Sequence, residues 1–371
     1  ERPDTFDCAI MISASHNPYY DNGIKLIAAS GDKFGDDVTA RLEAAVVDGE
    51  FSFDKEKLGR VSEDKTAAER YKEIALGMGG KELPLQGLKV VLDCANGCFS
   101  KIMPEVFAKL GADVTALSCM PDGTNINRDC GSQHIDAMTA KVRDCGAMLG
   151  IAADGDGDRI IICDEKGNRV DGDQIIAFLG KYYKEHNRLK ADTVVATIVS
   201  NPALDRFLEG IGVKCVRSAV GERYVIEEMK KCGSNIGGEE SGHMVVADYA
   251  KTGDTMMAAL VIAMGLLQSG KKMSEIFPLF TSMTRKRIDS KFCGKDEMLA
   301  AFELAAFQAE IKQGEADIAG KGRILVRKSG TEPKIQVWVW GDDVPLATAV
   351  SNRIASVLEK ADGFESRKEV L

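Results

Sequence analysis

The chain has 371 residues, 48 of them basic and 57 acidic, so its formal charge at neutral pH is −9. This length is enough for about two to four domains. No block of Lys or Arg is long enough to follow a phosphate backbone, which argues against a nucleic-acid partner. The longest apolar stretch, Met256 to Leu267, is shorter than the roughly 20 residues of a membrane span and predicts a buried helix, so no membrane partner is expected.

Ten cysteines are scattered along the chain without paired Cys-x-x-Cys sets. This spacing favours reduced thiols, mostly small core residues of a cytoplasmic protein, over a disulfide framework or a zinc site. The sequence opens on Glu1 rather than Met, and the first predicted strand, Ala9 to Ile12, follows almost at once. We therefore expect an N-terminal segment of the first domain to be missing.

The first polar loop follows this strand and reads Ser13-Ala14-Ser15-His16-Asn17-Pro18, with Lys25 shortly after it. A serine hydroxyl at its ordinary pKa is a poor nucleophile and needs a base or an electrophilic partner. No Gly-x-Ser-x-Gly elbow supports a hydrolytic triad. Two interpretations of Ser15 stay open: a serine that carries a phosphoryl group, and a polar turn whose side chains satisfy their own backbone.

Strand–helix–strand patterns then recur along the chain. Leu88 to Leu92 predicts a strand, an amphipathic helix continues through Phe107 and Leu110, and Gly111 ends it before a strand that begins at Ala112. Such units predict α/β domains with mostly parallel sheets and helices on their faces. The same order recurs later, in Thr193 to Val199, Pro202 to Leu208, Gly212 and Val213 to Val216.

The second polar loop, Asp154-Gly155-Asp156-Gly157-Asp158-Arg159, follows a predicted strand, Ala147 to Ala153. Alternate residues of an extended loop point to one side, and the glycines let the three carboxylates converge. Two unit charges about 4 Å apart repel by roughly 4 kcal/mol at an effective dielectric constant of about 20. Convergence therefore predicts a bound cation, and oxygen ligands favour Mg²⁺ or Ca²⁺.

The aspartate loop has two alternative interpretations. A calcium loop of EF-hand type is disfavoured, because Arg159 stands where glycine is needed and Ile160 to Cys163 predicts a strand instead of a helix. A solvated acidic turn stays open.

Two later loops suit a phosphorylated sugar. Gly238-Glu239-Glu240-Ser241-Gly242-His243 offers a carboxylate, a hydroxyl and an imidazole for vicinal sugar hydroxyls. Arg327-Lys328-Ser329-Gly330-Thr331 offers backbone amides, two hydroxyls and a guanidinium for a phosphate dianion. An ordinary turn is the alternative for each loop taken alone.

The C-terminal region predicts a small α+β domain. It contains one predicted helix, Asp296 to Ile311, and two strands, Arg323 to Arg327 and Lys334 to Trp340. Charged, loop-like stretches near residues 62–66, 165–173 and 281–287 predict the domain boundaries. We expect four domains, at residues 1–66, 67–167, 168–283 and 284–371, the first of them incomplete.

Taken in order, the four polar loops resemble those of the α-D-phosphohexomutase superfamily over essentially the whole chain. The finer pattern is similar to that of the bacterial phosphoglucosamine mutases. This finer resemblance rests on Ile12 to Lys25, Asp93 to Gly97, Gly123 to Asn127, and Gly238 to His243 followed by Thr252-Gly253-Asp254. It implies three mixed-sheet α/β domains and a C-terminal α+β domain around a central cleft.

The resemblance also implies what the site residues do. Ser15 would be the phosphoserine, and one Mg²⁺ per chain would bind the Ser15 phosphate together with Asp154, Asp156 and Asp158. Glu239 and Ser241 would bind the sugar. The distal phosphate would be bound by Arg327, Ser329, Gly330 and Thr331. The candidates for proton transfer or charge neutralisation would be His16, Lys25, Arg159 and His243.

The implied substrate is a hexosamine phosphate. The chain would interconvert glucosamine 6-phosphate and glucosamine 1-phosphate, with glucosamine 1,6-bisphosphate as intermediate and activator. Two alternatives stay open: a phosphomannomutase or phosphoglucomutase, and a non-catalytic, metal-dependent sugar-phosphate binder. The resemblance also implies a cytoplasmic enzyme of amino-sugar metabolism that supplies cell-wall precursors. It leaves the oligomeric state open, a homodimer being one alternative.

Overall fold

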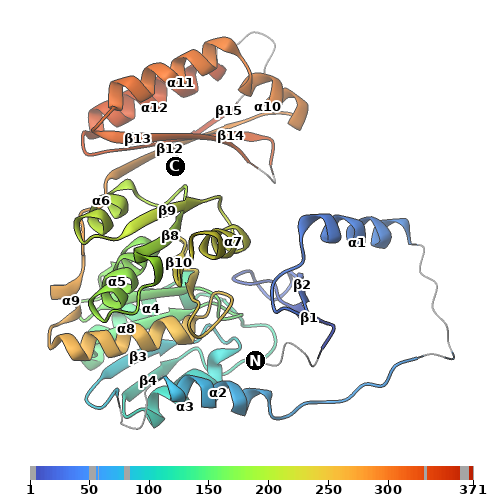
Figure 1. The fold of residues 1–371 in the computed structure, drawn as a ribbon, viewed down its shortest axis with the longest axis vertical. Helices are drawn as coiled ribbons and strands as arrows, with labels where there is room; N and C mark the ends of the chain where they lie inside the picture. Colours follow the sequence, from blue (N-terminus) through green and yellow to red (C-terminus); the bar gives the residue numbers. More distant parts are fainter. Residues whose placement is uncertain are drawn as a thin grey trace. The chain divides into compact units, whose positions relative to one another are not determined.

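The computed structural model describes residues 6–49, 56, 58–78, 84–329, 332–359 and 367–370, and the chain divides into two compact units (Figure 1). The first unit comprises Glu1–Thr197 and Gly212–Leu279, and the second comprises Ile198–Ile211 and Phe280–Leu371. Among the described residues, no helix combines the length and the apolar character that crossing a membrane would require.

The first unit begins with a two-stranded antiparallel hairpin, β1 (Cys8–Ile12) and β2 (Ile24–Ala28), followed by helix α1 (Asp36–Asp48). The strand predicted at Ala9 to Ile12 is therefore confirmed. The long connection between β1 and β2 carries the serine loop. Several apolar side chains of the hairpin are exposed, including Ile12 and Ile24.

A five-stranded sheet of the first unit has the order β4-β3-β5-β6-β7. Strand β3 pairs in parallel with β4 and β5, whereas β5–β6 and β6–β7 are antiparallel. Its strands are β3 (Lys89–Asp93), β4 (Asp113–Leu117), β5 (Leu149–Ala153), β6 (Ile160–Asp164) and β7 (Arg169–Val170). The helices of this region are α2 (Ala67–Gly77), α3 (Phe99–Lys109) and α4 (Asp136–Cys145).

This sheet is mixed, as the family resemblance implied, whereas the expectation of a mostly parallel sheet from the strand–helix–strand pattern is wrong here. The aspartate loop connects β5 to β6 in six residues, 154–159. A connection that short joins neighbouring strands only when they are antiparallel, since a parallel crossover needs a dozen or more residues. All residues of β5 and β6 are buried, which explains why both strands read as continuous apolar runs.

A four-stranded sheet of the same unit has the order β11-β10-β8-β9. The predicted buried helix is confirmed as α8, in which every residue from Thr255 to Leu266 is buried. The strands are β8 (Thr193–Thr197), β9 (Lys214–Ser218), β10 (Ile236–Gly238) and β11 (Met244–Val246). The helices are α5 (Gly172–Glu185), α7 (Glu222–Cys232), α8 (Thr255–Ser269) and α9 (Met273–Ile276).

The second unit is an antiparallel sheet with helices, in the strand order β13-β14-β12-β15. Helices α11 and α12 cover one face, where Phe307, Val337 and Ile354 are fully buried (Figure 1). The strands are β12 (Thr284–Lys291), β13 (Gly322–Lys328), β14 (Lys334–Gly341) and β15 (Arg367–Val370). The helices are α6 (Pro202–Gly210), α10 (Lys295–Phe302), α11 (Ala305–Ile318) and α12 (Val344–Glu359).

The helix predicted at Asp296 to Ile311 is wrong, because two helices, α10 and α11, occupy this stretch. Leu304 between them is extended, at φ −56° and ψ 126°. The break lets both Phe302 and Phe307 pack into the core of the sheet. Gln308 Nε2 donates to the carbonyl of Phe302 at 2.6 Å and so satisfies an acceptor that the helix end exposes.

The sequence-based prediction also gave this unit too few strand residues. Residues 281–287 were expected to form a charged boundary loop, yet β12 begins at Thr284. The guanidinium groups of Arg285 and Arg287 lie 5.1 and 4.8 Å from the centre of the Trp338 ring. The charges of Arg285 and Arg287 led to the loop prediction, but cation–π contacts with the neighbouring strand let both residues stand in a strand.

Phe307→Ala is expected to destabilise the second unit by about 3–5 kcal/mol, because it removes a fully buried ring from the sheet–helix core. Urea denaturation followed by tryptophan fluorescence measures this effect, since both tryptophans of the chain, Trp338 and Trp340, lie in β14. Leu299→Ala, on the half-exposed side of α10, is the control. Equal losses in the two variants would contradict the assigned core.

Candidate active site

The serine loop is held in one conformation by its own side chains and by a neighbouring segment. Ser15 adopts the left-handed conformation, at φ 55°. Its backbone N–H donates to Ser13 Oγ at 2.9 Å, and Asn127 Nδ2 donates to the carbonyls of Ser15 and Asn17, each at 2.9 Å. A Cβ at Gly23 would lie 2.4 Å from the Ser13 carbonyl oxygen, so this close approach requires glycine.

The aspartate loop brings three carboxylates together. One oxygen each from Asp154, Asp156 and Asp158 lies within 4.8 Å of the others. Contacts favour glycine at both intervening positions: a Cβ at Gly155 would lie 2.7 Å from the end of the Ile126 side chain, and one at Gly157, whose φ is 77°, would lie 2.4 Å from the Phe99 ring. The convergence that the spacing predicted is therefore present.

The chemistry of this acidic trio fits a divalent cation. Asp156 Oδ1 and Asp158 Oδ1 are buried and have no hydrogen-bond partner among the described residues. Burial, together with the charges of Asp158 and Asp156, raises the pKa of Asp154. A hard cation would satisfy the two orphaned oxygens and neutralise the crowded charge, so these three residues could hold Mg²⁺ or Ca²⁺.

The serine loop and the acidic trio share one site. Ser15 Oγ lies 3.4 Å from Asp154 Oδ2 and 3.4 Å from His16 Nδ1. Lys25 Nζ donates to Asp156 at 2.6 Å and to Asp158 at 3.2 Å, while Ser13 Oγ donates to Asp156 at 2.6 Å. Residues 139 positions apart in the sequence thus meet at the carboxyl ends of β1 and β5.

The loop between β10 and β11 adds His243 to this site. His243 is 4% exposed, and its Nδ1 lies 3.7 Å from Asp158 Oδ1. Its Nε2 lies 3.1 Å from Glu222 Oε1. Although burial alone lowers the pKa of His243, the two adjacent carboxylates, Asp158 and Glu222, raise it to about 9. Arg159 forms a backbone bridge with His243, and its Nε lies 4.0 Å from Asp158 Oδ1.

Glu239 and Ser241 lie in the same loop and contact each other. Ser241 Oγ donates to Glu239 Oε2 at 3.2 Å, and Glu239 Oε1 accepts from the backbone N–H of Gly221 at 2.8 Å. The backbone N–H of Ile160 donates to the Gly242 carbonyl at 2.9 Å, which joins this loop to the strand after the aspartate loop. Three of the four polar loops therefore come together within the first unit.

The fourth polar loop belongs to the second unit. Arg327 lies near the end of β13, and Ser329 follows it, while the predicted Gly330 and Thr331 lie outside the described residues. The backbone N–H of Ser329 donates to the Lys334 carbonyl at 2.9 Å. Partial burial, and then the charge of Arg287, lowers the pKa of Arg327 by more than the charge of Asp289 raises it.

Sequence reasoning missed the contributions of Ser13, Asn127 and Glu222. Asn127 lies in the Gly123–Asn127 segment and has a left-handed φ of 57°. The sequence could therefore predict a turn at this residue, but it could not predict the contact of Asn127 with the serine loop. Glu222 is the first residue of α7 and stands in no motif. Only its contact with His243 identifies it.

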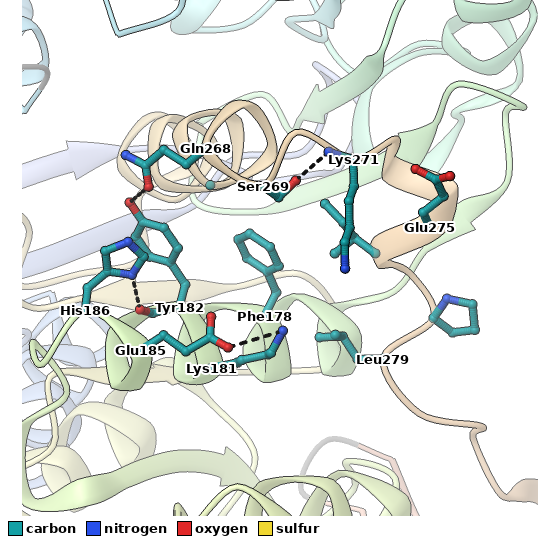
Figure 2. A pocket seen from close by; sticks show the side chains of 13 residues that line it. Phe178, Lys181, Tyr182, Glu185, His186, Gln268, Ser269, Lys271, Glu275 and Leu279 are labelled. Atoms are coloured by element: carbon teal, nitrogen blue, oxygen red, sulfur yellow. Dashed lines mark hydrogen bonds and ion pairs between the residues drawn. The ribbon is translucent and has the colours of Figure 1, made fainter.

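A separate pocket of about 450 Å³ lies between α5, α8 and α9 and contains none of the predicted site residues (Figure 2). Phe178 and Tyr182 form part of its wall, and Tyr182 donates from its hydroxyl to Gln268 Oε1 at 3.0 Å. At its edge, Lys181 and Glu185 form an ion pair at 3.4 Å. The pocket therefore lies apart from the acidic trio and the serine.

Comparisons with known proteins agree with this arrangement. Models of the phosphoglucomutase/phosphomannomutase α/β/α domains I, II and III match residues 3–52, 70–167 and 171–283, and the model of the C-terminal domain matches residues 290–357. The phosphoglucosamine mutase of Paramagnetospirillum magneticum is 44% identical over 361 residues, which cover 96% of this chain and 79% of the relative. That of Rhodospirillum centenum is 43% identical over 362 residues, covering 96% and 76%.

Crystal structures share the fold at lower identity. A phosphoglucomutase/phosphomannomutase family protein from Burkholderia thailandensis superposes with a TM-score of 0.78 at 20% identity, covering 97% of this chain and 78% of that one. The Aspergillus fumigatus N-acetylphosphoglucosamine mutase in complex with GlcNAc-6P and magnesium gives 0.70 at 18% identity, covering 94% and 88%. With four domain matches in order and over 40% identity along nearly its whole length, this chain belongs to the phosphoglucomutase/phosphomannomutase family of the α-D-phosphohexomutase superfamily.

Proposed function

We propose that the chain is a phosphoglucosamine mutase that interconverts glucosamine 6-phosphate and glucosamine 1-phosphate through glucosamine 1,6-bisphosphate. The observation that carries the chemistry is the Ser15 hydroxyl, 3.4 Å from Asp154 in a trio of converging carboxylates. The choice of glucosamine is supported by relatives named phosphoglucosamine mutase that are 40–44% identical to the chain.

Asp154, Asp156 and Asp158 would hold one Mg²⁺ together with a phosphate on Ser15. When bound, the ion would neutralise negative charge on the phosphoryl oxygens. Lys25 supplies a positive charge at the same carboxylates, since its Nζ lies 2.6 Å from Asp156 and 3.2 Å from Asp158. Positioning and charge neutralisation therefore carry most of the rate, as phosphoryl transfer requires.

In the proposed first half-reaction, the free sugar hydroxyl attacks the phosphorus on Ser15. A new bond forms between the sugar oxygen and phosphorus, the bond to Ser15 Oγ breaks, and the hydroxyl proton passes to a base in the site. The departing Ser15 Oγ takes up a proton. After the bisphosphate reorients, Ser15 Oγ attacks the phosphorus of its other phosphate, the bond between that phosphorus and the sugar oxygen breaks, and the serine proton passes through the site to the sugar oxygen. The candidates for proton transfer or charge neutralisation are His16, Lys25, Arg159 and His243, of which His16 Nδ1 lies 3.4 Å from Ser15 Oγ.

Glu239 and Ser241 would bind the sugar hydroxyls, because their hydrogen-bonding groups lie in the loop that also carries His243. The phosphate that does not react would be bound by Arg327, Ser329, Gly330 and Thr331. A single distal phosphate site explains how one active site handles both ends of the bisphosphate. Each of the four proposed domains, at residues 1–66, 67–167, 168–283 and 284–371, contributes one of the four loops.

A coupled assay tests this function. Rates measured with both glucosamine phosphates, and with the corresponding glucose and mannose phosphates, are expected to give the highest kcat/KM for glucosamine. Higher values for mannose or glucose phosphates would favour a phosphomannomutase or phosphoglucomutase. Tight sugar-phosphate binding without turnover of any of them would favour the non-catalytic binder.

Asn127→Asp is expected to lower kcat by about 10²-fold with little change in KM, because misplacing a reacting group by about 1 Å costs this much. The substitution replaces the two N–H donors that hold the carbonyls of Ser15 and Asn17 with acceptors. Asn125→Asp is the control, since the Asn125 amide group bonds only within its own loop, to Met120 and Asp122. Steady-state kinetics of both variants measure these effects. Equal decreases in kcat would contradict the role of Asn127 in positioning the serine loop.

A further inference from the structure

Glu222 joins three segments of the first unit at one buried carboxylate. Its side chain is 9% exposed. Its Oε1 lies 3.1 Å from His243 Nε2 and accepts a hydrogen bond from the backbone N–H of Gly253 at 3.1 Å, while its Oε2 pairs with Lys33 Nζ. A carboxylate with this many partners is held in one orientation.

The His243 ring occupies a narrow slot. A Cβ at Gly253 would lie 2.3 Å from both Cε1 and Nε2 of the ring, so only glycine leaves room for it. One nitrogen of the ring faces Glu222 at 3.1 Å, and the other faces Asp158 at 3.7 Å. Turning the ring over would place carbon atoms where the two nitrogens now face Glu222 and Asp158, so both ion-pair contacts favour the orientation in which Nδ1 points to Asp158.

We propose that Glu222 is a positioning residue for the acidic trio: it orients His243 and, through His243, the Asp158 carboxylate. This inference rests on the proposed function, in which Asp158 holds the metal. Carboxylate ligands are oriented by the groups that contact them from behind, and loss of such a group typically costs about 10–100-fold in metal affinity or activity. In this proposal Glu222 acts on the site through His243 and Asp158.

Glu222 is not the sole residue that contacts the segment after the first hairpin. The turn after β2 makes two other contacts with the region around α7 and α8, because Lys230 Nζ pairs with Asp32 at 2.6 Å and Lys251 Nζ donates to the Ser30 carbonyl at 3.0 Å. Among the described residues, two other polar contacts therefore accompany the Lys33–Glu222 pair in this area. If Glu222 only attached the hairpin, loss of Lys33 would have the same effect on the site as loss of Glu222. The two variants can therefore be compared directly.

The test compares Glu222→Gln with Lys33→Met. Long-range ¹H–¹⁵N spectra of the imidazole rings are readable because the chain has only four histidines. In Glu222→Gln, the ring signals of His243 are expected to shift while those of His134 and His186 stay in place. Calorimetric titration with Mg²⁺ is expected to show affinity lower by about 10-fold or more, with the KM for glucosamine phosphate unchanged. Lys33→Met is expected to keep wild-type affinity and ring signals.

Further outcomes would overturn the proposal or separate it from the proposed function. Unchanged His243 signals in Glu222→Gln, or equal losses in Lys33→Met, overturn the proposal. Glu222→Asp retains the charge and is expected to recover part of the Mg²⁺ affinity; a loss as large as that of Glu222→Gln also counts against it. If the wild-type chain turns over neither glucosamine phosphate, the proposed function fails, while the ring spectra and the Mg²⁺ titration still decide the role of Glu222.

Discussion

Ser15→Ala is expected to abolish mutase turnover, with a loss of at least about 10⁴-fold in kcat, while the protein stays folded. In the proposed mechanism, Ser15 Oγ is the atom that stores the phosphoryl group, and it lies 3.4 Å from the nearest carboxylate of the trio. The same coupled assay on both glucosamine phosphates measures the effect. Appreciable activity in this variant would contradict the phosphoserine scheme.

Ser13→Ala is the matched control for this prediction. Ser13 lies two residues away and donates to Asp156, but its hydroxyl is already committed to that bond and to the Ser15 N–H. Its loss removes hydrogen bonds worth about 1 kcal/mol each, so a modest decrease in activity is expected. Intact-mass analysis after incubation with glucosamine 1,6-bisphosphate should show one phosphoryl group on wild type and on Ser13→Ala, and none on Ser15→Ala.

Asp156→Asn is expected to lower kcat by about 10²–10³-fold, because it removes one charged ligand from the site that stabilises the transferring phosphoryl group. Without metal, this variant should be at least as stable as wild type. The substitution leaves two crowded carboxylates where there were three, at the cost of part of the Lys25 ion pair. Added Mg²⁺ should raise the Tm of wild type and leave that of the variant nearly unchanged, since only binding to the folded state stabilises it.

Asp144→Asn, on the exposed side of α4, is the control for the charge change alone. It should keep the Mg²⁺-dependent increase in Tm and the activity of wild type. Thermal unfolding with and without Mg²⁺ separates the two variants. An Asp156→Asn protein that still gains stability from Mg²⁺ would contradict the metal site at the acidic trio.

The sequence alone was sufficient for the local features. The alternation of aspartate and glycine predicted a converging trio, and the apolar runs before it and after it predicted β5 and β6, because both signals depend on neighbouring residues. Buried helix α8 was recognised in the same way, from its continuous apolar composition. The order of the four polar loops identified the family, which the domain matches confirmed.

Contacts between distant residues decided the rest. The break between α10 and α11 follows from the packing of Phe302 and Phe307 against a sheet that the helical pattern does not encode. The antiparallel pairing of β5 with β6 depends on their hydrogen-bond partners, and the charged strand β12 is stabilised by the Trp338 ring on β14. Local propensity differs by less than about 1 kcal/mol between most residues, so such tertiary contacts override it.

For the candidate site, the sequence by itself determined which residue types are present and in what local order. Only the tertiary structure decided which of them meet: Ser15 lies beside Asp154 across 139 positions, Asn127 holds the serine loop, and Glu222 reaches His243. The physical reason is that hydrogen bonds and ion pairs act over a few ångströms of space, whatever the separation along the chain.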